Sequence, residues 1–189
     1  FDGDGVDGSE WATSTSNGGS VTVSGGVVDI AGSEAAGWAQ LVSARSYDLP
    51  FVVERRSKVV STTGNPRNRF YPSPQDFDAG VFDGLQVYFN GWTGIYAPND
   101  AYMRMTTSVS ADQYRWVLEN LETKELIFDR SAATSPSGAI GQASGDNNGG
   151  IGGHSVTDWI FVRESAEVVP GVAVGAESTA ALALGMYTS

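Results

Sequence analysis

Polar and aromatic residues alternate along two strand-like segments of this chain, and together they have the chemistry to bind a sugar. Alternation places Gln86 and Tyr88 on one face of residues 85–90, and it places Tyr102 and Arg104 on one face of a later strand. Aromatic rings stack on the C–H faces of sugar rings, while Arg and Gln donate hydrogen bonds to hydroxyl groups. We expect the two faces to be neighbours that line a concave groove. The candidate carbohydrate-binding residues are Trp92, Tyr88, Tyr96, Tyr102, Arg56 and Arg104.

The alternative for each aromatic residue is a place in the hydrophobic core, where most large apolar side chains lie. Trp92 is the best candidate for exposure, because Gly91 and Gly94 place it on a turn. The remaining tryptophans are expected in the core: Trp11, Trp38, Trp116 and Trp159.

Acidic residues form a second group that could hold a ligand. Asp158 interrupts an otherwise apolar face of residues 155–163, to which Val156, Ile160 and Val162 belong. A half-buried carboxylate needs a partner, and a cation is one candidate. Further acids lie in the Gly-rich N-terminal segment: Asp2, Asp4, Asp7 and Glu10. Alternatively, the N-terminal acids cap turns and Asp158 accepts hydrogen bonds from backbone amides.

Residues suited to catalysis are scarce, and we predict that the protein is not an enzyme. His154 is the single histidine, there is no cysteine, and no G-x-S-x-G nucleophile motif occurs. Glycoside hydrolysis needs a pair of carboxylates, but the long strand-like segment 51–60 holds Glu54 alone.

The charge of the chain limits its partners. It has 22 acidic and 11 basic residues, which gives a formal net charge of −11. A strongly acidic surface repels nucleic acid and anionic lipid, so no nucleic-acid partner is expected. No segment is long and apolar enough for membrane insertion. The lack of cysteine excludes a disulfide framework and a Cys-ligated metal.

Short strand-like segments separated by Gly, Asn and Asp turns position these residues. Residues 20–24 and 27–31, for example, are joined by Gly25-Gly26 in a hairpin pattern. About a dozen such segments, without a sustained amphipathic helix, predict an all-β antiparallel β-sandwich. The polar segment 61–83 is expected to be a long loop.

The end of the chain differs in composition from the rest. We predict one sandwich over residues 1–175 and a C-terminal tail over residues 176–189. The tail is rich in Ala and Leu, which favours a short helix, although a strand that pairs with an identical subunit is an alternative.

Both ends of the predicted sandwich resemble those of concanavalin A-like (laminin-G or jelly-roll) domains. The chain opens with a Phe-Asp pair and a delayed Trp11, followed by the strand 27–30 after a double glycine. Residues 157–163 resemble the closing Val-Asp-Trp/Tyr-Ile-x-Val-Arg strand of such domains. The stretch 161–174 is similar to sandwich domains found with the DUF2341 type of microbial surface protein. The resemblance implies a concanavalin A-like jelly roll.

The same resemblance implies a calcium ion, because domains of this superfamily often bind one where the two chain ends meet. Its side-chain ligands would be Asp2, Asp4 and Asp158, with Asp7 as a weaker candidate. Calcium prefers oxygen ligands, which carboxylates and the carbonyls of Gly-rich turns supply.

The resemblance further implies a non-catalytic, extracellular or cell-surface module that binds a polysaccharide or surface glycan. Glycosidases of this fold carry an acid-rich strand and its lyases a Gln-x-His strand, and neither pattern occurs in this sequence. One alternative is a structural subunit of a filament, appendage or virion that contacts identical subunits through the tail. A second alternative is a polysaccharide-active enzyme.

Overall fold

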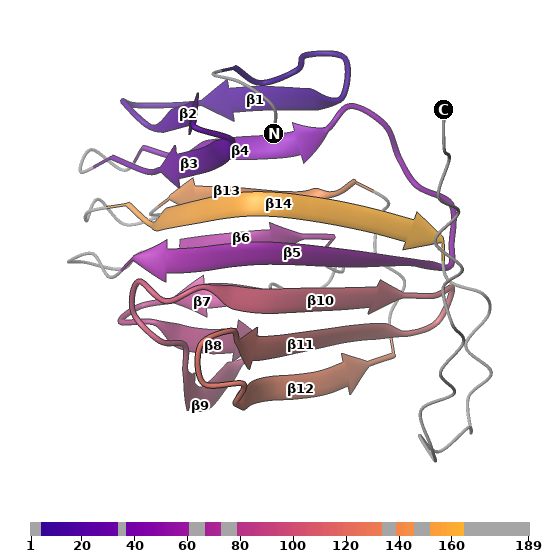
Figure 1. The fold of residues 1–189 in the computed structure, drawn as a ribbon. Coiled ribbons are helices and arrows are strands. Elements are labelled where there is room, and N and C mark those ends of the chain that lie inside the picture. Colours follow the sequence, from indigo (N-terminus) through magenta and orange to yellow (C-terminus); the bar gives the residue numbers. More distant parts are fainter. Residues whose placement is uncertain are drawn as a thin grey trace, which may run out of the picture.

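Alternating inward and outward side chains build two antiparallel sheets that pack face to face. A computed structural model describes residues 5–33, 37–60, 67–72, 79–133, 139–145 and 152–164. Sheet A has the strand order β1-β4-β13-β6-β7-β8-β9, and sheet B has the order β12-β11-β10-β5-β14-β3-β2 (Figure 1). The predicted all-β antiparallel sandwich is therefore confirmed, while the tail 176–189 lies outside the described residues.

The strands are short in sheet A and longer in the middle of sheet B. Sheet A consists of β1 (Trp11–Thr15), β4 (Ala39–Ser43), β13 (Gly141–Gly145), β6 (Arg67–Tyr71), β7 (Ala79–Phe82), β8 (Gln86–Phe89) and β9 (Trp92–Tyr96). Sheet B consists of β12 (Leu126–Ala132), β11 (Tyr114–Asn120), β10 (Met103–Val109), β5 (Phe51–Val60), β14 (His154–Glu164), β3 (Val27–Ala31) and β2 (Ser20–Ser24).

Local sequence patterns account for many of these strands. Gly25 and Gly26 have φ angles of 59° and 79°, the left-handed conformation that a two-residue hairpin turn requires, and they join β2 to β3 as predicted. The prediction of one long loop over residues 61–83 is wrong, because this segment contains β6 and β7. The described part of the chain contains no helix that could cross a membrane.

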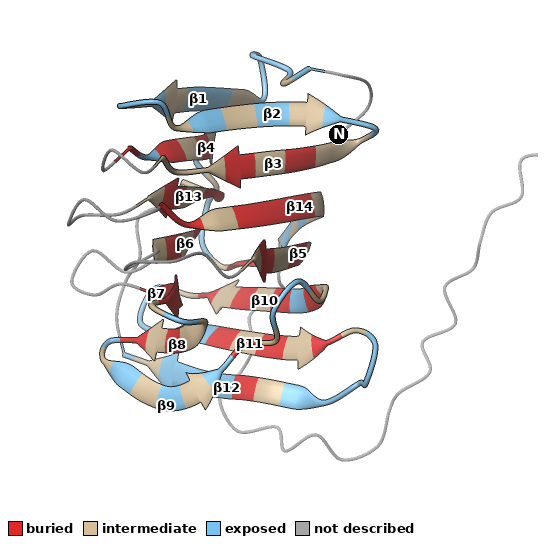
Figure 2. Ribbon diagram, turned by 90° about the vertical axis from the view of Figure 1, so that its left-hand side faces the viewer, coloured by how far each residue is buried: buried red, intermediate tan, exposed pale blue. Residues whose placement is uncertain are grey.

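Polar side chains divide the core between the sheets into two apolar clusters. The larger cluster includes the fully buried Trp116, and the smaller consists of Val28, Ile30, Ala39 and Leu41. Between them, β13 and β14 direct polar residues inward. Figure 2 shows the two layers side by side, with β13 and β14 between the strands of the two clusters. We call these buried residues the polar layer: Ser57, Asn68, Gln142, Ser144, Ser155 and Thr157.

The central strand β14 contains a bulge that the alternation pattern does not predict. Its pairing with β5 shifts between Thr157 and Trp159, so that Asp158 is the extra residue. Thr157 and Ile160 consequently both face the core, in register with Ser57 and Arg55. The predicted single face that joined Asp158 to Ile160 is therefore wrong.

Candidate functional site

A hollow of about 290 Å³ opens on the outer face of sheet A. It lies over three neighbouring strands, β4, β13 and β6, whose outward positions converge there. The side chains of β6 alternate, so that Arg67, Arg69 and Tyr71 share the outer face while Asn68 and Phe70 are buried. The residues that line the hollow are Trp38, Gln40, Arg67, Arg69, Tyr71, Ala143, Ser144 and Gly145.

Small residues on β13 create this hollow. Ala143 stands opposite Arg69, and Gly145 stands opposite Arg67, in the pairing of β13 with β6. On the other side of β13, Ala143 pairs with Gln40 of β4. The outward positions of β13 thus leave open space between the polar side chains of its two neighbours.

Trp38 forms one wall of the hollow. Its side chain lies directly over Gly145, where an added Cβ would come within 2.7 Å of the Trp38 Cβ atom. The residue is 40% exposed, so the prediction that it belongs to the core is wrong. A sequence signal for this position exists, because Trp38, which directly precedes β4, is two residues from the polar Gln40 and both line the hollow.

Beside the hollow lies a group of aromatic residues on β7, β8 and β9, which we call the aromatic cluster: Phe82, Tyr88 and Trp92. Tyr88 stacks on Phe82 at a centroid distance of 5.0 Å, and Trp92 meets Tyr88 edge-on at 5.1 Å. The Arg67 guanidinium lies 5.6 Å from the centre of the Phe82 ring and so joins the cluster to the hollow.

Two of the sequence-predicted aromatic residues on this face are well exposed. Trp92 is 52% exposed and Tyr96 is 62% exposed, and both belong to the edge strand β9. With Tyr88, they form the half of the predicted carbohydrate set that the structure brings together. Sequence analysis missed the other residues of this face, because it placed Arg67, Arg69 and Tyr71 in a loop.

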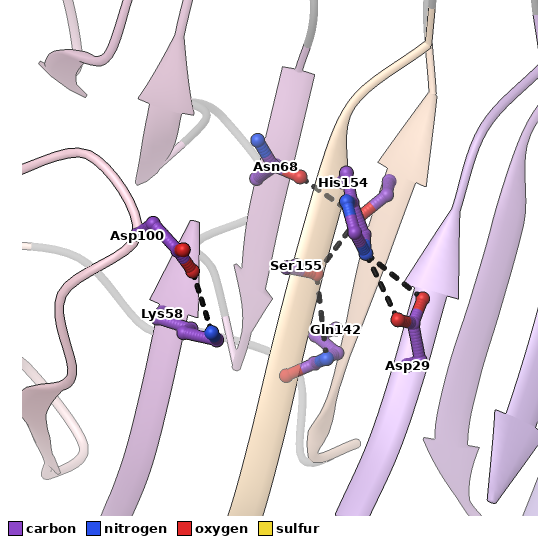
Figure 3. Close-up of polar contacts among 8 residues, drawn as sticks. Asp29, Lys58, Asn68, Asp100, Gln142, His154 and Ser155 are labelled. Atoms are coloured by element: carbon purple, nitrogen blue, oxygen red, sulfur yellow. Dashed lines mark hydrogen bonds and ion pairs between the residues drawn. The ribbon is translucent and has the colours of Figure 1, made fainter. Parts of the chain in front are cut away.

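Inter-sheet hydrogen bonds hold the two central strands of this face from beneath. The Ser144 hydroxyl donates to Asn68 Oδ1 at 2.8 Å and lies 2.8 Å from the Ser155 hydroxyl. Figure 3 shows Asn68, Gln142 and Ser155 of this layer. Thr157 donates from its hydroxyl to Gln142 Oε1 at 2.5 Å. Each bond links sheet B to sheet A or β13 to β6, so the polar layer fixes β13 and the strand β6 that carries Arg67 and Arg69.

Arg55 adds a buried cation to this support. From β5 it donates hydrogen bonds to the carbonyl oxygens of Gly141, at 2.6 Å, and of Tyr71. Burial lowers the pKa of the Arg55 guanidinium to about 10, so it stays protonated at neutral pH. The charged side chain therefore crosses the core and links β5 of sheet B to β13 and β6 of sheet A by hydrogen bonds.

The remaining predicted sugar-binding residues lie on the opposite side of the molecule, on the outer face of sheet B. The Arg56 guanidinium forms an ion pair with Asp158 and lies 3.9 Å from the centre of the Tyr102 ring. Arg104 pairs with Glu119 at 3.6 Å. Segments 85–90 and 102–109 therefore belong to different sheets, and the prediction that their polar faces are neighbours is wrong.

The structure gives the predicted calcium ligands no common site within the described residues. Asp158 carries the Arg56 ion pair, and a calcium ion there would be repelled by the guanidinium. Asp7 caps its own turn, and hydrogen bonds from Ser9 lower the pKa of the Asp7 carboxyl. No group of three or more potential metal ligands occurs in the described part of the chain. Asp2 and Asp4 lie outside that part, so calcium binding stays a prediction.

The single histidine belongs to the other sheet and does not line the hollow. His154 Nε2 lies 2.9 Å from an Asp29 carboxylate oxygen on the outer face of sheet B (Figure 3). The residues that line the hollow include neither a carboxylate nor a histidine. They can donate hydrogen bonds and stack on a ring, but they do not supply the pair of acids that glycoside hydrolysis uses.

Comparisons by sequence give no match, neither to a family model nor to a curated protein. Solved structures do match. The exoplasmic/lumenal domain of VIP36, described as bound to Ca²⁺ and Man3GlcNAc, is 12% identical with a TM-score of 0.56, over 85% of this chain and 88% of that one. The carbohydrate-binding module CBM66 from Bacillus subtilis is 15% identical with a TM-score of 0.52, over 83% of this chain and 96% of that one.

An enzyme is also among the structural neighbours. The alginate lyase AlgAT5 of polysaccharide lyase family 7 is 10% identical with a TM-score of 0.51, over 77% of this chain and 82% of that one. At these identities the likeness concerns the fold. The chain has the concanavalin A-like jelly-roll fold, as its resemblance predicted. The narrower link to DUF2341-associated domains stays a prediction.

Proposed function

We propose that this protein is a non-catalytic carbohydrate-binding module, and that its ligand lies on the outer face of sheet A. The observation that carries the proposal is the convergence of Trp38, Gln40, Arg69 and Tyr71 around one hollow. Sugar sites combine such ring faces with a few hydrogen-bond donors that fix orientation. The fold neighbours described as a carbohydrate-bound lectin domain and a carbohydrate-binding module support the same class of ligand.

The binding surface is long enough for a polysaccharide chain. From β4 to β9 it covers six adjacent strands, which at roughly 4.8 Å per strand span about 24 Å. Trp38 stands at one end and the exposed Trp92 and Tyr96 at the other. We therefore infer an extended glycan as the ligand, and an extracellular or cell-surface location where such a polymer is accessible.

The proposal is tested by screening the purified protein on a glycan array and measuring the best ligand by isothermal titration calorimetry. Trp38→Ala and Trp92→Ala are expected to weaken binding about tenfold each, because they remove stacking surface. Phe161→Ala is the matched control, since Phe161 is 63% exposed but lies on the outer face of sheet B. Binding that is unchanged in both tryptophan variants, or weakened equally by the control, contradicts the proposal.

The non-catalytic part of the proposal needs its own measurement. After long incubation with the bound polysaccharide, we expect no new reducing ends and no unsaturated uronate product. Appearance of either product, and its loss in a variant of Tyr71 or Arg69, would establish a polysaccharide-active enzyme instead.

A further inference from the structure

A bulge interrupts β9, the strand at one edge of sheet A (Figure 1). Tyr88 of β8 pairs with Trp92, and Gln86 of β8 pairs with Tyr96. Between these two pairs β8 has one residue, whereas β9 has three, residues 93–95. Two residues of β9 are therefore extra, and the regular pairing of the two strands is broken at this point.

Residues inside the bulge hold its shape. The Thr93 hydroxyl donates a hydrogen bond to the Val87 carbonyl at 2.6 Å and accepts one from the Ile95 amide at 3.1 Å. Gly94 has a φ angle of 73°, a left-handed conformation that a side chain would strain. Ile95 packs against the larger core cluster and so anchors the bulge from beneath. The bulge is thus fixed by its own hydrogen bonds and by the core.

The bulge shortens the distance between two exposed aromatic residues. In a regular strand, residues four apart lie about 13 Å from each other, and residues two apart lie about 7 Å from each other. Trp92 and Tyr96 are four apart in the sequence, but their partners Tyr88 and Gln86 are only two apart. The backbones of the two aromatic residues are therefore brought to the shorter spacing. Cross-strand pairing directs both side chains to the outer face of sheet A.

Both rings are accessible in this arrangement. Trp92 is 52% exposed and Tyr96 is 62% exposed. The Trp92 ring meets Tyr88 at an interplanar angle of 87° and Phe82 at 82°, so it does not stack on either of them. The amide of Gln86, in register with Tyr96, can donate and accept hydrogen bonds. Two accessible rings and one amide at this spacing are groups that can contact a single sugar ring.

This group of residues is separate from the hollow. None of the three residues lines the hollow, which lies over β4, β13 and β6. Three strand spacings separate β6 from β9, which is about 14 Å at roughly 4.8 Å per strand. A short oligosaccharide in the hollow therefore does not reach β9, whereas a longer chain that crosses the strands does.

We propose that Gln86, Trp92 and Tyr96 form a second subsite, which we call the edge subsite, and that the bulge of β9 sets its geometry. This inference rests on the proposed function, because the edge subsite binds a distal sugar ring of the same glycan chain. It narrows the ligand class to oligomers and polymers that span both sites. Once the hollow holds one part of such a chain, binding of the other part is intramolecular, so the affinity increases with chain length.

Chain length is the first test, and it uses the unaltered protein. Partial hydrolysates of cellulose, chitin, mannan and pectin, and of any further polysaccharide that binds on the glycan array, are separated into oligomers from the disaccharide to the octasaccharide. In calorimetric titrations, at least one series should show a rise in affinity of at least about tenfold at the length that reaches β9. An affinity that is the same for all oligomers that bind overturns the edge subsite.

Variants assign this rise in affinity to the edge subsite. Tyr96→Ala, Thr93→Val and Gly94→Ala are expected to weaken binding of the octasaccharide at least about tenfold and to leave binding of the shortest ligand unchanged. Thr93→Ser keeps the hydroxyl group and should bind like the original protein. Trp38→Ala, by contrast, should weaken binding of oligomers of every length. Thr106→Val is the matched control, because Thr106 is a half-buried threonine of β10 in sheet B.

The outcomes separate this inference from the proposed function. Equal losses for short and long oligomers, or no loss for long oligomers in Tyr96→Ala, overturn the edge subsite and leave glycan binding intact. A loss in Tyr96→Ala without a loss in Thr93→Val and Gly94→Ala overturns the positioning role of the bulge. Absence of binding to every oligomer and to every glycan on the array overturns both proposals.

Discussion

Arg56 and Asp158, which are 102 residues apart in the sequence, form an ion pair on the outer face of sheet B. The β-bulge in β14 places the carboxylate beside β5, and the ring of Tyr102 covers the guanidinium. Two residues that sequence analysis assigned to different ligands, a sugar and a metal ion, thus bind each other.

This pair is expected to contribute modestly to stability. Side chains of Arg56 and Asp158 are 37% and 31% exposed, and exposed pairs of this kind contribute about 0.2–1 kcal/mol. Arg56→Gln, Asp158→Asn and the double variant form a double-mutant cycle that measures the coupling in urea unfolding. Glycan binding should be the same in all of them. A loss of glycan binding in Arg56→Gln would return this residue to the binding site.

Calcium can be tested with the same Asp158→Asn variant. If the N-terminal acids hold calcium, the melting temperature of the original protein rises with excess Ca²⁺ and falls after EDTA, because a ligand of the folded state stabilises it. The calcium-dependent rise should be the same in Asp158→Asn, since Arg56 already occupies that carboxylate. A melting temperature that does not change on addition of EDTA would contradict calcium binding. A calcium-dependent rise that is absent in Asp158→Asn would indicate that Asp158 is a ligand.

Filling the hollow should abolish binding without removing a charge or a ring. Ala143 faces outward between Gln40 and Arg69, so the side chain of Ala143→Phe would occupy the space that a sugar needs. We expect at least about a tenfold loss of glycan affinity and little change in melting temperature. Ser131→Phe, at an exposed position of β12 in sheet B, is the control. Unchanged affinity in Ala143→Phe would place the ligand elsewhere.

Stability in acid should depend in part on Asp129. Arg115 donates two hydrogen bonds to this carboxylate, at 2.8 and 2.6 Å, and they lower the pKa of Asp129 below its ordinary value of 3.8. A lowered folded-state pKa means that the contribution is complete above the unfolded-state pKa and is lost as the pH falls through the folded-state value. The difference in melting temperature between the original protein and Asp129→Asn should therefore be constant near neutral pH and shrink below about pH 4. A difference that grows in acid would contradict this assignment.

Arg55 should matter more for stability than any surface arginine. Arg55→Leu leaves the carbonyl oxygens of Gly141 and Tyr71 without their guanidinium donors, at a cost of about 1–3 kcal/mol. Arg104→Leu, whose side chain is 47% exposed, should change stability by no more than about 0.5 kcal/mol. Guanidinium chloride unfolding measures both. Equal effects of the two substitutions would mean that the buried hydrogen bonds of Arg55 make no net contribution to stability, as is known for some buried charges.

Local patterns predicted much of the fold. The Gly25-Gly26 hairpin, the long strand β5 and the exposure of Trp92 are properties of short segments, and the structure confirms each of them. Alternation also assigned the correct face to residues within β8 and within β10. Which strands become neighbours depends instead on the path of the chain, which passes from sheet A at β9 to sheet B at β10. The prediction of a groove lined by both β8 and β10 is wrong for this reason.

The best part of the candidate site was missed for a different reason. The segment that contains β6 is rich in Pro, Asn and Gly, which are typical of loops, and this composition conceals the alternation of Arg67, Arg69 and Tyr71. Likewise Trp38 was assigned to the core by residue type, although its face also carries Gln40. The bulge at Asp158 has no local signal in the sequence, because a neighbouring strand must be present to define the extra residue.

The polar layer also bears on how the molecule opens. On one side of it, β1, β2, β3 and β4 share an apolar cluster built on four buried residues, whereas the cluster on the other side is several times larger. Native-state hydrogen exchange should therefore reveal two cooperative units. The amides of β3 and β4 should exchange through a local unfolding of lower free energy than the unfolding that exposes the amides of β10 and β11. Since β4 carries Gln40 and adjoins Trp38, that opening would disassemble one wall of the hollow while the rest of the sandwich stays folded. A bound glycan should then slow exchange in β4 more than in β11.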